Sequence, residues 1–162
     1  MILLAENKYG KSRVRLARVR RHADRHDFRE WTVEILLEGD FDSCFTQGNN
    51  RKILPTDTMK NTVYSLARNS SAESIEEFAK ELLGFLLGRN PQVCGGQVTI
   101  QEKCWERLAV AGKPHPSTFV QSSGERQTTE VSAARDGRIR VRSGLENLVI
   151  LKTAGSEFVG FL

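Results

Sequence analysis

The segment of residues 54–64, LPTDTMKNTVY, gathers side chains that handle protons and anions at the start of an expected helix. Thr56 offers a hydroxyl, Asp57 a carboxylate and Lys60 an amine. The free N–H groups and the positive end of the dipole at a helix start favour an anion. The same residues also suit plain helix capping by Asp57 or Thr58, with Lys60 on the helix surface. The segment therefore predicts either a cap or part of an anion site.

Basic residues concentrate near the start of the chain. Residues 1–25 carry eight lysines and arginines against two acidic residues, an excess larger than the net charge of +4 for the whole chain. Arg138, Arg140 and Arg142 repeat the pattern. A solvated strand face is the favoured interpretation, and a field that attracts an anion is the alternative. No aromatic residues alternate with these arginines for base stacking, so a nucleic-acid partner is not expected.

Histidines and cysteines give no metal-site pattern. His22 and His26 are four residues apart, but they lie in an expected turn and are interpreted as solvent-exposed. Cys44, Cys94 and Cys104 are odd in number and form no CxxC pair, so reduced structural thiols are expected. The sequence predicts no metal site.

The composition is that of one ordinary globular domain. The 162 residues are 39% hydrophobic and 27% charged. No apolar stretch approaches the roughly 20 residues of a membrane-spanning helix, and the opening MILLAE is too short for a signal peptide. We expect a soluble cytoplasmic protein without membrane contact.

Alternation of apolar and polar residues predicts an opening hairpin. Residues 13–20 read as a strand with a bulge near Ala17, and residues 22–27 form the polar turn. Trp31, Val33, Ile35 and Leu37 then follow at period two. Two strands with one wet face are therefore expected.

Two helices and further strands follow. Helical spacing marks residues 59–66 and 75–86, the second with a capping box of Ser74 and Glu77. Extended segments are expected at 98–105, 117–132, 138–142 and 148–152, the last as a buried strand. This order predicts an α+β fold in which two helices pack on one face of an antiparallel four-stranded sheet, ββααββ.

The last five residues, 158–162, are almost wholly apolar. Chain termini normally lie at the surface, so this end predicts docking onto a partner or, preferably, a chain that continues beyond it.

Five segments in order resemble urate oxidase (uricase), a tunnelling-fold (T-fold) family. They are YGK at 9–11, LLEGDF at 36–41, PTDTMKNTVY at 55–64, GKPHPSTF at 112–119 and LKTAGSEFVGF at 151–161. The resemblance covers nearly the whole chain but only the first half of the family's subunit. It implies a first T-fold domain at 1–152 and, at 153–162, the start of a connection to a second.

The resemblance also implies site residues. The family's catalytic lysine and threonine fall on Lys11 and Thr56, its substrate-contacting aspartate on Asp57, and the phenylalanine that stacks on the purine on Phe158. Its arginine and glutamine clamp and its relay histidine would lie beyond Leu162.

The implied activity is oxidation of urate by O2 to 5-hydroxyisourate with release of H2O2, without metal or cofactor. The family assembles as a homotetramer, and a eukaryotic member would be peroxisomal. Without the clamp and the relay histidine, this chain alone is expected to be inactive. A non-catalytic T-fold module for binding or assembly is the alternative.

Overall fold

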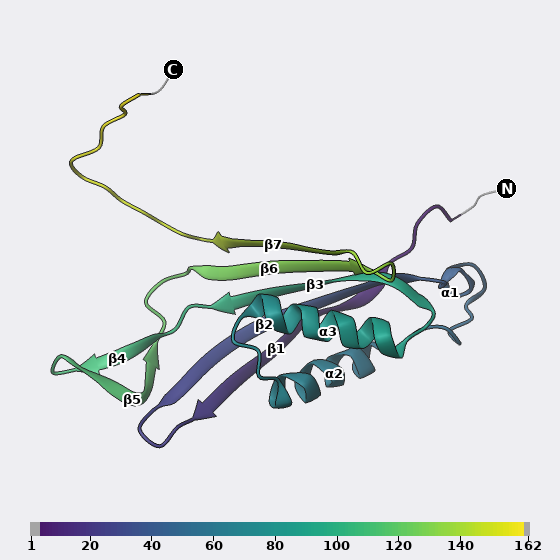
Figure 1. Ribbon diagram of the computed structural model, residues 1–162, viewed down its shortest axis with the longest axis horizontal. Helices are drawn as coiled ribbons and strands as arrows, with labels where there is room; N and C mark the ends of the chain where they lie inside the picture. Colours follow the sequence, from purple (N-terminus) through teal and green to yellow (C-terminus); the bar gives the residue numbers. More distant parts are fainter. Residues whose placement is uncertain (1–3, 161–162) are drawn as a thin grey trace.

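The protein is a layer of helices on a twisted antiparallel sheet (Figure 1). The computed structural model describes residues 4–160. The strands are β1 (Tyr9–Arg21), β2 (His26–Gly39), β3 (Val93–Lys103), β4 (Glu106–Val110), β5 (Lys113–Val120), β6 (Arg126–Ala134) and β7 (Ile139–Glu146). The helices are α1 (Asp42–Gln47), α2 (Thr56–Asn69) and α3 (Ile75–Arg89). Five strands form the main sheet in the order β1-β2-β3-β6-β7, and β4 and β5 form a separate hairpin.

The core lies between the sheet and the two long helices. Trp31, Val33, Ile35 and Leu37 on β2 are all fully buried, which confirms the predicted alternation. Helix α2 contributes Met59, Val63 and Ala67. Helix α3 contributes Ile75, Phe78, Ala79, Leu82, Leu83 and Leu86. Within residues 4–160 both long helices cover the same face of the sheet, and no helix lies on the other face (Figure 1).

The start of α3 follows the sequence closely. The Glu77 N–H donates to the Ser74 hydroxyl at 3.2 Å, and the Glu77 carboxylate accepts from the Ser74 N–H at 3.3 Å. This confirms the capping box.

The α+β class and the antiparallel sheet hold, but the predicted count of four strands is wrong. Residues 117–132 are not one strand, because residues 121–125 interrupt them and β5 and β6 belong to different sheets. Residues 139–146 add a fifth strand to the main sheet as its edge. The short helix α1 was not predicted.

The predicted bulge near Ala17 is also wrong. The register between β1 and β2 shifts between Lys11 and Val14 instead. The change of phase in the apolar pattern does not mark a bulge. The strand stays regular, so Val19 points to solvent and is 40% exposed, whereas Arg18 points inward and donates to the Ser70 carbonyl after α2.

Residues 148–152 do not form the expected buried strand. Leu148, Val149, Ile150 and Leu151 are 50–89% exposed, since no described element packs on them. Phe158 and Val159 are also exposed, at 84% and 76%. The rest of the predicted apolar end, Phe161 and Leu162, lies outside the described residues.

The cysteines and His22 form no metal site or disulfide within the described residues. All three cysteines are free thiols, and Cys94 is exposed. His22 is an exposed turn residue that contacts Asp27 at 3.0 Å. Within residues 4–160 no group of three or more His, Cys, Asp or Glu side chains is placed to hold a metal ion. No helix in that part of the chain is long and apolar enough to cross a bilayer.

Candidate functional site

Lys11 lies on β1 at a locally irregular point of the sheet. A Cβ on the preceding residue, Gly10, would lie 1.7 Å from the Ile35 carbonyl oxygen of β2, so only glycine fits there. The bulge follows at once, with Arg13 in the left-handed region at φ 56°. The YGK segment is thus a close strand contact followed by a bulge, and Lys11 stands between them.

Tyr9 joins this part of β1 to the approach to α2. The Leu54 N–H donates to the Tyr9 hydroxyl at 2.7 Å, and the hydroxyl donates to the Leu54 carbonyl at 3.3 Å. The Tyr9 ring packs edge-on against Phe41, with ring centroids 4.7 Å apart. Lys11 follows Tyr9 by two residues on a strand, and Thr56 follows Leu54 by two, so this contact brings both to the same region.

Helix α2 begins without a side-chain cap. Pro55 is the N-cap residue, and the first helical bond runs from the Met59 N–H to the Pro55 carbonyl at 3.1 Å. The prediction that Asp57 or Thr58 caps the helix is therefore wrong, because both already lie in its first turn. The first N–H groups of α2 have no acceptor within the helix, and Thr56 and Asp57 are exposed beside them.

Asp57 is held by lysines. Its carboxylate accepts from the Lys60 ammonium at 3.0 Å. This hydrogen bond and the charge of Lys60 lower the pKa of Asp57, and the charge of Lys11 lowers it further. This contribution of Lys11 is consistent with the Tyr9–Leu54 contact, which anchors β1 beside the approach to α2. Lys11 and Lys60 supply two positive charges against the single negative charge of Asp57, so the start of α2 carries a net positive charge.

The Tyr9–Leu54 hydrogen bonds and the influence of Lys11 on the pKa of Asp57 place Lys11 in the region of Thr56 and Asp57. The roles that the resemblance gives these residues stay predictions. Among the described residues no hydrogen bond joins Lys11 to Thr56. Thr56 and Asp57 are exposed and Lys11 is partly exposed, so the three side chains form an open surface, called the wall below.

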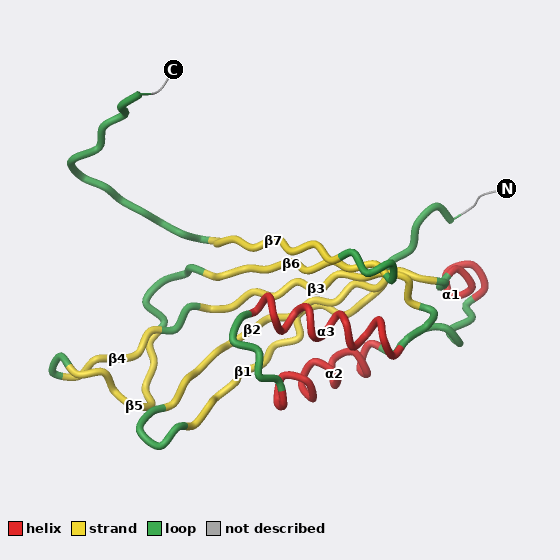
Figure 2. The backbone as a smooth tube through the Cα atoms, viewed as in Figure 1, coloured by secondary structure: helices red, strands yellow, loops and turns green. Residues whose placement is uncertain are grey.

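Phe158 is not part of this wall. It follows β7, which lies at the opposite edge of the sheet from β1, about 19 Å away across four strand spacings. Figure 2 shows the segment after β7 as loop that runs away from the sheet. One chain in this conformation does not place Phe158 over Thr56.

The sequence did not predict the part that Lys60 and Tyr9 play in this wall. Lys60 was interpreted as a residue of the helix surface, although its i,i+3 spacing from Asp57 was a visible signal for an ion pair. Tyr9 gave no local signal, since its partner Leu54 is 45 residues away.

Comparison with known proteins identifies the family. The uricase family model matches residues 7–132, which contain Lys11, Thr56 and Asp57. The chain belongs to the uricase family. Phe158 lies outside the matched residues, so its role depends on the residue resemblance alone.

Individual uricases agree with this assignment. The chain is 42% identical to uricase-2 from Phaseolus vulgaris and 35% identical to uricase from Cyberlindnera jadinii, over 97% and 98% of its length. It spans about half of these relatives, 51% and 53%.

Solved structures show the same fold. The crystal structure of uricase from Arthrobacter globiformis superimposes on 99% of this chain with a TM-score of 0.87 and 34% identity, and the match covers 54% of that chain. A urate oxidase from Bacillus sp. TB-90 shares the fold at a TM-score of 0.80 and 24% identity.

Proposed function

We propose that this chain is the first part of a cofactor-free urate oxidase. The observation that carries the proposal is the wall of Lys11, Thr56 and Asp57, which lies inside the segment matched by the uricase family. The reaction would be urate + O2 + H2O → 5-hydroxyisourate + H2O2. Urate is the reductant and O2 the oxidant, so the protein would have to bind, orient and move protons.

Lys11 and Thr56 would move the protons. A threonine hydroxyl is a weak base by itself, but it passes a proton efficiently when an amine lies beside it. The Tyr9–Leu54 contact supports this pairing because it anchors β1 to the start of α2. Substrate in the gap between the two side chains would complete the relay.

The start of α2 would hold the negative charge of urate. The free N–H groups of the first turn offer donors to an anion. Lys11 and Lys60 outnumber the single carboxylate of Asp57, so the local field favours a monoanion. Asp57 would contact the substrate from a position fixed by Lys60.

Phe158 would stack on the flat purine ring. Since it lies far from Thr56 in the same chain, the stacking ring would meet this wall across a contact with another copy, in the homotetramer that the family resemblance implies. The exposed apolar side chains of residues 148–159 support such an association. Residues 1–152 would then be the first T-fold domain and 153–162 the connection to the second. The expected location is the cytoplasm, or the peroxisome in a eukaryote.

Ultraviolet absorbance of urate and uptake of oxygen, followed together with the purified chain, test the proposal. We expect no turnover, because this wall lacks the clamp and the relay histidine that the family would supply from its second half. Rapid loss of urate with matching oxygen uptake by this chain alone would contradict the assignment of an incomplete site.

A non-catalytic binding or assembly module is the second candidate. The exposure of Thr56 and Asp57 favours it, because a catalytic site normally encloses its substrate more fully. The two candidates differ in what happens when the second half is restored: only the enzyme gains urate oxidation that depends on Thr56.

A further inference from the structure

A pocket of about 310 Å³ lies at the other end of β1 from Lys11. It forms where the tip of the β1–β2 hairpin meets the β4–β5 hairpin and the connection between α2 and α3. From Lys11 to Arg20 the strand advances nine residues, roughly 30 Å. The pocket is therefore separate from the proposed urate wall. Its volume is at the lower end of the range for small-molecule sites.

The pocket is rich in positive charge. Four guanidinium groups line it, those of Arg18, Arg20, Arg29 and Arg107. Only two carboxylates line it with them, Asp27 and Glu73. This leaves a formal excess of two positive charges in one small concave space, which a bound anion would offset.

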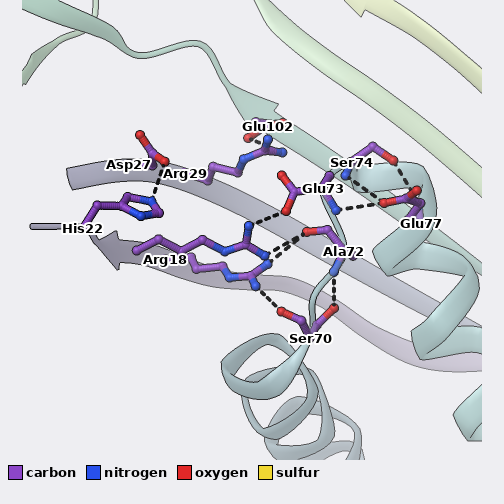
Figure 3. Close-up of polar contacts among 11 residues, drawn as sticks. Arg18, His22, Asp27, Arg29, Ser70, Ala72, Glu73, Ser74, Glu77 and Glu102 are labelled. Atoms are coloured by element: carbon purple, nitrogen blue, oxygen red, sulfur yellow. Dashed lines mark hydrogen bonds and ion pairs between the residues drawn. The ribbon is translucent and has the colours of Figure 1, made fainter. Parts of the chain in front are cut away.

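Neutral backbone carbonyls hold two of these arginines in place. Arg18 donates to the carbonyls of Ser70 and Ala72 in the α2–α3 connection (Figure 3). Arg107 donates to the carbonyls of His26 at 2.6 Å and Pro116 at 2.8 Å. Such bonds fix the orientation of a guanidinium without cancelling its charge. The Arg107 guanidinium also lies 3.4 Å from the Asp27 carboxylate.

Carboxylates pair with the other two. Arg20 pairs with Glu73 at 2.5 Å, whereas Arg29 lies 3.7 Å from Glu102. Figure 3 shows Arg18, Arg29 and Glu73 at the same end of the hairpin. Burial, together with the charges of Arg20 and Arg29, lowers the pKa of Arg18. The guanidinium groups therefore repel one another in the unliganded chain.

Three aromatic rings form another side of the pocket. Phe28 lies edge-on to Trp105 at a centroid distance of 5.4 Å and beside Phe119 at 5.6 Å. The guanidinium of Arg107 stacks over the Phe119 ring at 4.9 Å. Ring faces next to arginines suit a ligand that is both flat and negatively charged.

We propose that this pocket binds a small planar aromatic anion, such as an aromatic carboxylate, between the arginines and the Phe28–Trp105–Phe119 rings. The negative group would lie against Arg29 and Arg20, and the ring of the ligand against the aromatic side. The proposal does not depend on urate oxidation, because it concerns a different part of the molecule.

Naphthalene-2-carboxylate is a suitable probe for the 162-residue chain, with binding measured by calorimetry and by NMR of the two tryptophan indole N–H groups. We expect saturable binding that shifts the signal of Trp105, which lines the pocket, more than the signal of Trp31, which is fully buried and lies beneath Arg18. The neutral naphthalene-2-carboxamide should bind at least tenfold more weakly, as should inorganic phosphate, which lacks a ring. Absence of saturable carboxylate binding, or equal binding of the carboxamide, would overturn the proposal.

Variants locate the probe. Arg29→Gln should weaken binding about tenfold, the usual loss for a charge-assisted hydrogen bond. Arg21→Gln removes the same charge from an exposed residue that does not line the pocket, and it should change affinity less than twofold. Equal losses of affinity in both variants would show that only the overall charge of the protein matters, and this would refute the site. Loss of binding in Thr56→Ala would refute it as well, because the probe would then occupy the wall at α2.

Discussion

Tyr9 and Leu54 exchange two hydrogen bonds across 45 residues of sequence: the Leu54 N–H donates to the phenol oxygen at 2.7 Å, and the phenol donates to the Leu54 carbonyl at 3.3 Å. The pair anchors the segment before α2 to β1, two residues from Lys11 on one side and two from Thr56 on the other. Burial raises the pKa of the Tyr9 phenol, so the hydroxyl retains its proton for this role.

Tyr9→Phe should lower the free energy of unfolding by about 1–3 kcal/mol, because it leaves a partly buried N–H and carbonyl without their partner. Urea denaturation measures the change. Tyr64→Phe is the matched control: its hydroxyl donates to the Arg15 carbonyl at 3.2 Å from an exposed position, and its loss should cost less than about 0.5 kcal/mol. Equal losses of unfolding free energy in the two variants would show that Tyr9 does not anchor this segment.

The carboxyl group of Asp57 should titrate below the usual aspartate range. Lys60→Met should raise its pKa most and Lys11→Met should raise it less, in the order of the interactions that lower it. Carbon-13 NMR of the side chain measures both changes. Lys52→Met, which removes the partner of Asp40, serves as the control and should leave Asp57 unchanged. No response to Lys11→Met would show that Lys11 does not reach the wall.

The sign of the pH effect follows from the same interactions. A carboxyl group with a lowered pKa in the folded state stabilises the fold above its unfolded-state pKa of about 4. That contribution should disappear as the pH falls through the lower folded-state value. The pH dependence of unfolding below pH 4 should therefore weaken in Lys60→Met.

Gly10→Ala should destabilise the protein by about 2–3 kcal/mol, since a methyl group at this position meets the Ile35 carbonyl and the strands must separate locally. Gly84→Ala offers the opposite case. It lies inside α3 with open space around its Cβ position, and alanine should stabilise the helix by about 0.5–1 kcal/mol. Thermal unfolding distinguishes the two; a neutral Gly10→Ala would contradict the close contact between strands.

Local patterns were sufficient to predict most of the sheet and helix layer. The alternation of Trp31 to Leu37 and the Ser74–Glu77 capping box each depend on neighbours within a few residues, and both are confirmed. Residues 138–142 were predicted to be extended but were not counted in the sheet, where residues 139–142 form the start of β7. The β4–β5 hairpin was missed because residues 117–132 carry strand-forming residues almost throughout. The first part of that segment, β5, pairs with β4, and the last part, β6, pairs with β3, and such pairing depends on tertiary contacts.

The candidate site was predictable only in part. Thr56 and Asp57 are neighbours in sequence, and their place at a helix start could be derived. The proximity of Lys11 depends on β1 packing beside α2, which no local pattern encodes, and it came from the resemblance to uricases. The bulge was misplaced because an arginine at φ 56° gives no compositional sign of a left-handed residue.

Urate oxidation by a completed chain tests the central claim most directly. Residues 1–162 joined to the second half of the Arthrobacter globiformis uricase would supply the part of that relative that this chain does not span, on a first half of closely similar fold. We predict oxygen uptake coupled to loss of urate, and a fall of about 10²–10⁴-fold in rate for Thr56→Ala. A folded chimera that does not oxidise urate, or one whose rate is unchanged by Thr56→Ala, would contradict the account.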